Sequence, residues 1–190
     1  VYPDPLAPKS IGVMLSPTPV HPSGPPPQHY FPDVARDSEW VREQLSPLIP
    51  RLEERLAMLS GGRPVVPLDR PRPHRLATVR EMSAGYGAPT HVDAYVLSEG
   101  LASLFENTDR ATQLSWYVVL QLPGSGGELE VASRWGESER VIPLEVGDGV
   151  LFDGGRLQHR VTSVASEPAR ITVGGFAGLA RSRDSLYYWG

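Results

Sequence analysis

The prolines of this chain are unevenly distributed, and this limits what each part can fold into. Sixteen of the twenty prolines fall within residues 1–75, and only four are spread over the remaining 115 residues. Proline fixes the φ angle and lacks a backbone N–H, so a Pro-dense segment forms neither a helix interior nor a central strand. We therefore predict that residues 1–36 form a Pro-rich extended arm, with residues 11–15 as its one strand candidate.

An amphipathic helix is predicted over residues 37–62, as a support for the part of the chain that follows. Apolar residues recur there at spacings of three and four, which places them on one helix face. Asp37 and Ser38 are typical N-cap residues, because their side-chain oxygens accept hydrogen bonds from the first helical N–H groups. Pro47 and Pro50 lie inside this stretch and are expected to kink or divide the helix.

From residue 75 onward the apolar residues alternate, which is the period of a β-strand. The alternating segments are short and are bounded by Gly, Pro, Ser or Asp, a pattern that favours a β-sandwich or barrel over alternating β–α units. Residues 94–112 lack this alternation and are predicted to form a loop with a short helix, long enough to cover a site. The predicted strands are residues 75–82, 114–122, 128–132, 140–143, 150–153, 159–164 and 170–176.

The composition excludes several classes of site and partner. The chain has no cysteine, which excludes disulfides and thiolate metal sites and leaves His and carboxylates as the strong metal ligands. The net charge of −4 and the lack of a basic stripe argue against a nucleic-acid partner. No run of eighteen apolar residues occurs, so no membrane partner is expected. No secretory leader is visible, and we expect a cytoplasmic protein.

Two of the five histidines stand in a context that suits metal binding. His91 begins the triplet His91-Val92-Asp93, and residues i and i+2 of a strand share a face, so an imidazole and a carboxylate can be presented together. His159 follows 68 positions later, inside another predicted strand. Two His and one carboxylate form the facial triad that holds Fe(II). The alternative is ordinary structural or surface polarity, which is common for a His-x-Asp pair.

Arg170 and Thr172 share one face of the last predicted strand. The strand is otherwise apolar, and an unpaired buried charge is costly. A guanidinium binds a carboxylate through two parallel hydrogen bonds, and a neighbouring hydroxyl adds a third. A bound dicarboxylate would therefore supply the missing partner of Arg170, whereas the alternative is a structural salt bridge.

Together, these motifs resemble the Fe(II)/2-oxoglutarate-dependent oxygenase superfamily, particularly its compact prolyl-4-hydroxylase-like members. The resemblance covers residues 75–178 and rests on the order of the motifs, with the spacing between the second His and the Arg typical of the family. In chain order these are Tyr86-Gly87, His91-Val92-Asp93, a long loop, a strand over residues 115–121, Gly126-Gly127-Glu128-Leu129, residues 144–152, His159-Arg160-Val161 and Arg170-Ile171-Thr172.

The resemblance implies a mainly β fold, a double-stranded β-helix or jelly-roll over residues 75–178, with the metal between its two sheets. Residues 37–190 would then form a single catalytic domain. The resemblance assigns iron to His91, Asp93 and His159, and the distal carboxylate of 2-oxoglutarate to Arg170 and Thr172. The nearest candidates for the other end of 2-oxoglutarate are Tyr117 and Arg80, for which a core position and a salt bridge are the alternatives.

The implied activity is that of a dioxygenase with Fe(II) as cofactor and 2-oxoglutarate and O2 as cosubstrates. It would hydroxylate or otherwise oxidise an unactivated C–H of a small molecule, such as an amino acid or a specialised metabolite. The halogenating members of the superfamily replace the carboxylate ligand with a small residue, so Asp93 favours hydroxylation. The single lysine among eighteen basic residues indicates GC-rich, bacterial coding and favours a biosynthetic role. The alternatives are a peptidyl or protein hydroxylase and a non-catalytic, cupin-like binding module.

Overall fold

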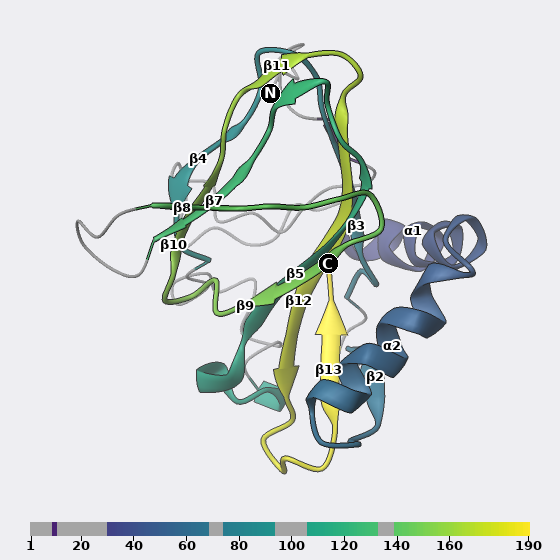
Figure 1. The fold of residues 1–190 in the computed structure, drawn as a ribbon. Helices are drawn as coiled ribbons and strands as arrows, with labels where there is room; N and C mark the ends of the chain where they lie inside the picture. The colour runs from purple at the N-terminus through teal and green to yellow at the C-terminus, as the bar shows by residue number, and fades with distance from the viewer. Residues whose placement is uncertain (1–8, 11–29, 69–73, 94–105, 133–138) are drawn as a thin grey trace. The chain divides into compact units, whose positions relative to one another are not determined.

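The computed structural model describes residues 9–10, 30–68, 74–93, 106–132 and 139–190 (Figure 1). The chain divides into two compact units, which we treat separately. Unit 1 comprises Val1–Ile11, Val79–Ala94 and Ser115–Gly174, and unit 2 comprises Gly12–Thr78, Tyr95–Leu114 and Gly175–Gly190.

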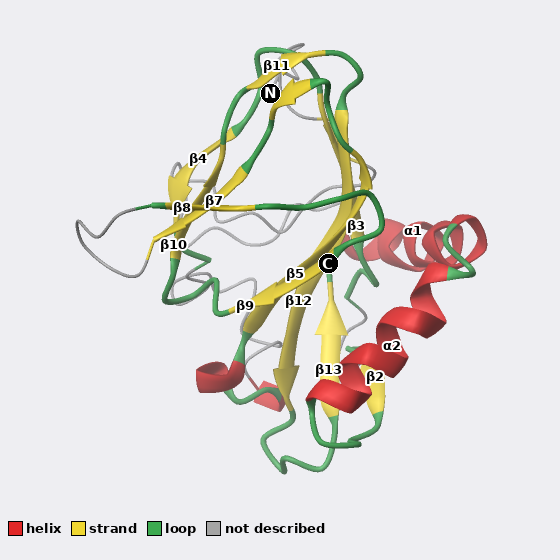
Figure 2. Ribbon diagram, in the orientation of Figure 1, coloured by secondary structure: helices red, strands yellow, loops and turns green. Residues whose placement is uncertain are grey.

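Unit 1 is built from antiparallel β-sheets, which Figure 2 draws in yellow. A four-stranded sheet has the order β4-β10-β7-β8, formed by Ala88–His91, Gln158–Val161, Leu129–Ala132 and Arg140–Ile142. A second sheet contains β1 (Lys9–Ser10), β3 (Thr78–Met82), β12 (Arg170–Leu179), β5 (Leu114–Gln121) and β9 (Gly149–Phe152), with the first half of β12 belonging to unit 1. The short strands β6 (Ser125–Gly126) and β11 (Val164–Ser166) pair with each other.

The core of unit 1 comes from apolar and β-branched side chains on these strands. Val119 and Val173 are fully buried, and Trp116, Leu129 and Val164 are nearly so. Burying one such aliphatic side chain stabilises a fold by about 1.5–3 kcal/mol. The mainly β, jelly-roll fold class predicted from the sequence is therefore confirmed.

Unit 2 contains the helices, which Figure 2 draws in red, and a smaller set of strands. The strand β13 pairs antiparallel with the second half of β12 and parallel with β2. Buried side chains, among them Val41 and Leu56 from the helices, Tyr188 from β13 and Leu76 from the segment before β3, form its core. Its elements are α1 (Tyr30–Gln44), α2 (Leu48–Leu59), β2 (Val65–Pro67), the 3-10 helix η2 (Arg110–Thr112) and β13 (Leu186–Trp189).

The helix predicted over residues 37–62 is two helices, divided at Pro47 as expected. The prediction of an extended arm is wrong for residues 30–36, because α1 begins at Tyr30. Pro32 lies in the first turn of α1, where the backbone N–H groups have no intrahelical partner, so a proline is tolerated. The rest of the predicted arm, including residues 11–15, lies outside the described residues except for β1.

Asp37 and Ser38 are not N-cap residues, because both lie within α1. The Asp37 carboxylate instead forms a buried ion pair with Arg75, at 2.7 Å. The Ser38 hydroxyl accepts a hydrogen bond from the backbone N–H of Leu76, at 3.2 Å. These polar residues therefore attach α1 to the segment around Arg75 instead of capping the start of a helix.

All seven predicted strands are present, with shifted ends. The strands β1, β2, β4, β6 and β13 were not predicted, and β11 shares only Val164 with the predicted strand over residues 159–164. The strand β4 contains Pro89, and a proline in a sequence argues against a central strand. It is tolerated because β4 is the edge of its sheet, where a missing N–H costs no ladder hydrogen bond. Most of the predicted loop over residues 94–112 lies outside the described residues. None of the described helices is long and apolar enough to cross a membrane.

Candidate metal centre

His91 and His159 lie opposite each other on the neighbouring strands β4 and β10. Their rings are tilted, with centroids 4.2 Å apart. The strand β4 ends at His91, so Asp93 lies beyond it and the predicted shared strand face is wrong. Asp93 is held in place instead by its backbone N–H, which donates to the carbonyl of Gly154 at 2.7 Å.

The three residues offer ligand atoms that all lie within 4.8 Å of one another. One oxygen of Asp93 lies 3.7 Å from Nε2 of His91, and the other lies 3.4 Å from Nε2 of His159. The side chain of His159 is 8% exposed, that of Asp93 16% and that of His91 42%. The cluster is therefore buried on the side of His159 and open to solvent on the side of His91.

Hydrogen bonds to the backbone set the tautomer of both imidazoles. Nδ1 of His91 lies 2.7 Å from the carbonyl of Pro89, and Nδ1 of His159 lies 3.0 Å from the carbonyl of Leu157. A carbonyl only accepts, so each Nδ1 carries a proton, and Nε2 is the nitrogen that each ring presents to Asp93. This pattern orients histidines for metal ligation.

Burial lowers the pKa of His159, despite the opposing effects of Asp93 and the Leu157 carbonyl. The neutral imidazole, which is the form that ligates a metal, is thereby favoured. Two imidazole nitrogens and one carboxylate fit Fe(II) and leave further coordination positions open.

A second polar group lies in unit 1, at the start of β12. Arg170 is only 3% exposed, and its guanidinium carbon lies 5.3 Å from the centre of the Tyr117 ring. Among the described residues, neither Nε and Nη2 of Arg170 nor the Tyr117 hydroxyl has a hydrogen-bond partner. Leaving a buried donor unpaired costs about 1–3 kcal/mol. These groups are therefore suited to an anionic ligand.

Burial lowers the pKa of Arg170 and raises that of Tyr117 to about 12, against the opposing effect of the nearby guanidinium. Tyr117 therefore keeps its proton at neutral pH and can donate it to an acceptor. Gly127 leaves room beside the arginine, because a Cβ there would lie 3.1 Å from Cδ of Arg170. Its φ of +74° also suits glycine.

Thr172 is buried two positions after Arg170 in the same strand. Arg80 lies in β3, and its positive charge lowers the pKa of both His159 and Arg170. The structure thus brings Arg80 close enough to influence both the histidine cluster and the buried arginine. It brings together His91, Asp93 and His159, and it separately places the Arg170 guanidinium over the Tyr117 ring.

Sequence reasoning missed Ser115 and Gly154. The Ser115 hydroxyl donates a hydrogen bond to Oδ2 of Asp93. Gly154 lies against both residues, and its carbonyl accepts from Asp93. A Gly-rich turn before His159 was the one available signal for Gly154, whereas a serine in a strand carries none.

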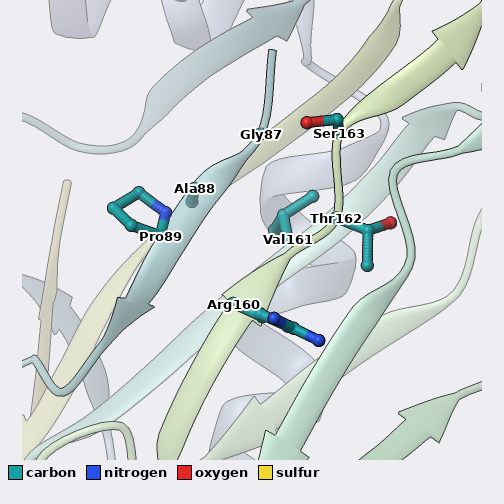
Figure 3. Close-up of a pocket in the computed structure, with 7 residues that line it drawn as sticks. All are labelled: Gly87, Ala88, Pro89, Arg160, Val161, Thr162 and Ser163. Carbon is teal, nitrogen blue, oxygen red and sulfur yellow. The ribbon is translucent and has the colours of Figure 1, made fainter. Parts of the chain in front are cut away.

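A pocket of about 410 Å³ lies over the β4–β10 pair (Figure 3). Gly87, Ala88 and Pro89 line it from β4 and the turn before it, opposite the segment from Arg160 to Ser163. Arg160 is paired with Glu130 and, at 2.7 Å, with Glu139. Its charge is therefore already balanced, and the pocket does not include the histidine cluster.

Comparisons with known proteins were made by sequence and by fold. Residues 135–190 match the family described as carrier-protein-independent halogenase WelO5. This stretch includes His159, Arg170 and Thr172. A search of curated protein sequences finds no match.

Several solved structures are similar in fold. An oxidoreductase of the 2OG-Fe(II) oxygenase family from Burkholderia pseudomallei is 18% identical, with a TM-score of 0.46 over 72% of this chain and 53% of that one. A Pseudomonas putida prolyl-4-hydroxylase is 17% identical, with a TM-score of 0.39 over 53% and 48% of the two chains. A Trichoplax adhaerens prolyl hydroxylase, solved with a peptide fragment of hypoxia inducible factor, is 18% identical, with a TM-score of 0.40 over 80% and 55%.

The chain spans about half the length of these solved structures. The resemblance to 2-oxoglutarate-dependent oxygenases, predicted from the motifs, recurs in these comparisons. Fe(II), 2-oxoglutarate and O2 are the cofactor and cosubstrates that this resemblance implies, and the His-Asp-His cluster fits the iron.

Proposed function

We propose that the chain is an Fe(II)/2-oxoglutarate-dependent oxygenase. The observation that carries the proposal is the cluster of His91, Asp93 and His159, in which both Nε2 atoms face one carboxylate. The buried, unpaired guanidinium of Arg170 in the same unit adds a site for the cosubstrate. A cupin-like binding module would account for the sheets but not for an arginine buried without an acidic partner.

In this proposal His91, Asp93 and His159 hold the iron, which, when bound with 2-oxoglutarate and O2, supplies the oxidising power to attack a C–H bond. The Arg170 guanidinium binds the distal carboxylate of 2-oxoglutarate through its unpaired Nε and Nη2. The Tyr117 hydroxyl, whose pKa is raised to about 12, donates a further hydrogen bond. Thr172, buried two positions after Arg170 in β12, supports the same carboxylate.

Arg80 balances the other end of the cosubstrate. 2-Oxoglutarate carries two negative charges. Burial lowers the pKa of Arg170, and the positive charge of Arg80 lowers it further, so the two guanidinium groups repel each other. Because Arg80 also influences His159, we place the carboxylate nearer the metal beside Arg80.

We propose hydroxylation or a related oxidation in preference to halogenation. The matched halogenase family is similar to the C-terminal stretch, which does not include the position of Asp93. The carboxylate of Asp93 faces both imidazoles and so takes the position that a halide ligand would need.

The substrate that we propose is a small molecule, such as an amino acid or a specialised metabolite. A peptidyl or protein side chain is the second candidate, since the cluster is open to solvent at His91. Residues 37–190 are proposed to act as one catalytic domain. The bacterial origin and cytoplasmic location stay predictions.

The test is to measure binding first and turnover second. Purified chain, kept anaerobic, is titrated with Fe(II) and 2-oxoglutarate and followed by calorimetry and visible absorption. We expect 2-oxoglutarate binding that requires the metal, and then succinate release on admitting O2. Folded protein that binds neither Fe(II) nor 2-oxoglutarate would overturn the proposal. A panel of amino acids and peptides that raises succinate release above background then identifies the substrate class.

A further inference from the structure

Asp93 needs a support that its own strand does not give, because β4 ends two residues before it. Its backbone is tied by the hydrogen bond to the Gly154 carbonyl, but that bond leaves the carboxylate free to rotate. The Ser115 hydroxyl donates a hydrogen bond to this carboxylate, at Oδ2.

Ser115 is well placed to fix the carboxylate. It is 6% exposed, so water competes little for its hydroxyl. It lies in β5 opposite Phe152 of β9, and the chain then turns so that Gly154 N–H donates to the Phe152 carbonyl at 2.9 Å. Ser115 therefore reaches Asp93 from β5, and Gly154 reaches it from the turn that follows β9.

Gly154 leaves the space in which this hydrogen bond forms. A Cβ at position 154 would overlap the Ser115 hydroxyl and Oδ2 of Asp93, and would lie 2.9 Å from the Ser115 Cβ. The neighbouring Gly155 differs, since a Cβ there would make only ordinary contacts, at 3.6 Å to Asp153 and 3.9 Å to the Asp93 carbonyl. The two adjacent glycines thus form a matched pair for an experiment.

We propose that Ser115 is a positioning residue for the metal ligand Asp93, and that Gly154 makes its hydrogen bond possible. With Oδ2 occupied by the Ser115 hydroxyl, the carboxylate offers Oδ1 as a single-oxygen ligand. A carboxylate that bound through both oxygens would take an extra coordination position, which a triad site needs for its cosubstrates. This inference rests on the proposed function, because it presumes that the cluster binds a metal.

The experiment uses Co(II) alone as the probe, added to the full chain freed of metal. Ser115→Ala is expected to weaken Co(II) binding by roughly 10–100-fold, the usual effect of losing a residue that orients a metal ligand. It should also shift the visible absorption of bound Co(II), because the carboxylate changes its mode of binding. Gly154→Ala should reproduce both effects, whereas Gly155→Ala should match the wild type.

Circular dichroism and the Tm of the metal-free variants separate a positioning role from a structural one. A loss of Co(II) affinity with an unchanged spectrum and Tm supports the proposal. Wild-type affinity and absorption in folded Ser115→Ala and Gly154→Ala would overturn it. If the wild type itself binds no Co(II), the metal site fails and with it the proposed function, which is a distinguishable result.

Discussion

Arg75 in unit 2 and Arg170 in unit 1 are both buried, at 0% and 3% exposed, but their charges have different surroundings. Arg75 lies 2.7 Å from the carboxylate of Asp37. Arg170 has no ion-pair partner among the described residues, and two of its nitrogens have no hydrogen-bond acceptor. A buried charge that is balanced within the chain stabilises the fold, whereas one that is left unbalanced marks a site for a ligand.

Two tyrosines repeat this contrast. The Tyr188 hydroxyl in unit 2 donates to Glu53 at 2.6 Å, and burial together with that carboxylate raises the pKa of Tyr188. The Tyr117 hydroxyl in unit 1 has no partner within the described part of the chain. Among the described residues, Arg75 and Tyr188 of unit 2 have acidic partners, whereas Arg170 and Tyr117 of unit 1 have none, which allows matched substitutions.

The largest effect is expected from Arg75→Ala, which removes the buried counterion of the Asp37 carboxylate and leaves it only the exposed guanidinium of Arg36, at 3.2 Å. We expect a loss of about 3–5 kcal/mol in the free energy of unfolding, measured with urea. The double variant Asp37→Asn with Arg75→Met should recover much of this loss, because no uncompensated charge remains. An unchanged free energy of unfolding in Arg75→Ala would show that the ion pair does not hold α1.

The second effect concerns His74, a buried residue of unit 2 whose pKa burial lowers from 6.5 to about 4. Between these values the unfolded chain binds more protons, so stability is fully present above pH 6.5 and is lost as the pH falls towards 4. The loss reaches up to about 3 kcal/mol at pH 4. Urea unfolding from pH 7 to 4 measures it, and His74→Gln should flatten the curve. Equal pH dependence in both proteins would contradict this account.

Arg170→Met is predicted to act in the opposite way to substitutions at Arg75. It should leave the free energy of unfolding of the metal-free chain unchanged or raised, because an unpaired buried charge is removed. Binding of 2-oxoglutarate in the presence of Fe(II) should weaken by roughly 100-fold, since the carboxylate loses its charged partner. Calorimetry and urea unfolding of the same preparation test both parts. A marked loss of stability with normal binding would make Arg170 a structural residue.

The smallest effect is expected from removing single hydroxyls. Tyr117→Phe should weaken 2-oxoglutarate binding by about 5–10-fold, equivalent to one hydrogen bond, without a loss of stability. Tyr188→Phe should lower the free energy of unfolding by about 1 kcal/mol and leave 2-oxoglutarate binding unchanged. A loss of stability with normal 2-oxoglutarate binding in Tyr117→Phe, or weakened 2-oxoglutarate binding in Tyr188→Phe, would contradict the proposed difference between the two units.

The parts of the molecule that follow from local pattern were predictable from the sequence. Alternation of apolar residues indicated the strands of unit 1, and the motif order singled out His91, Asp93 and His159, which the structure brings within 4.8 Å. Pairing over long sequence distances was not predictable. Asp37 reads as a helix cap because its partner Arg75 lies 38 positions away, and the role of Ser115 depends on a contact 22 positions back.

The most direct measurement of the central claim is anaerobic calorimetry of 2-oxoglutarate with the wild-type chain, with and without Fe(II), beside His159→Ala. We predict binding of one 2-oxoglutarate per chain that requires Fe(II), and its loss in His159→Ala while the circular dichroism spectrum is retained. Binding of 2-oxoglutarate that is indifferent to Fe(II) and to His159, or no binding by the folded wild type, would contradict the assignment of unit 1 as an iron and 2-oxoglutarate site.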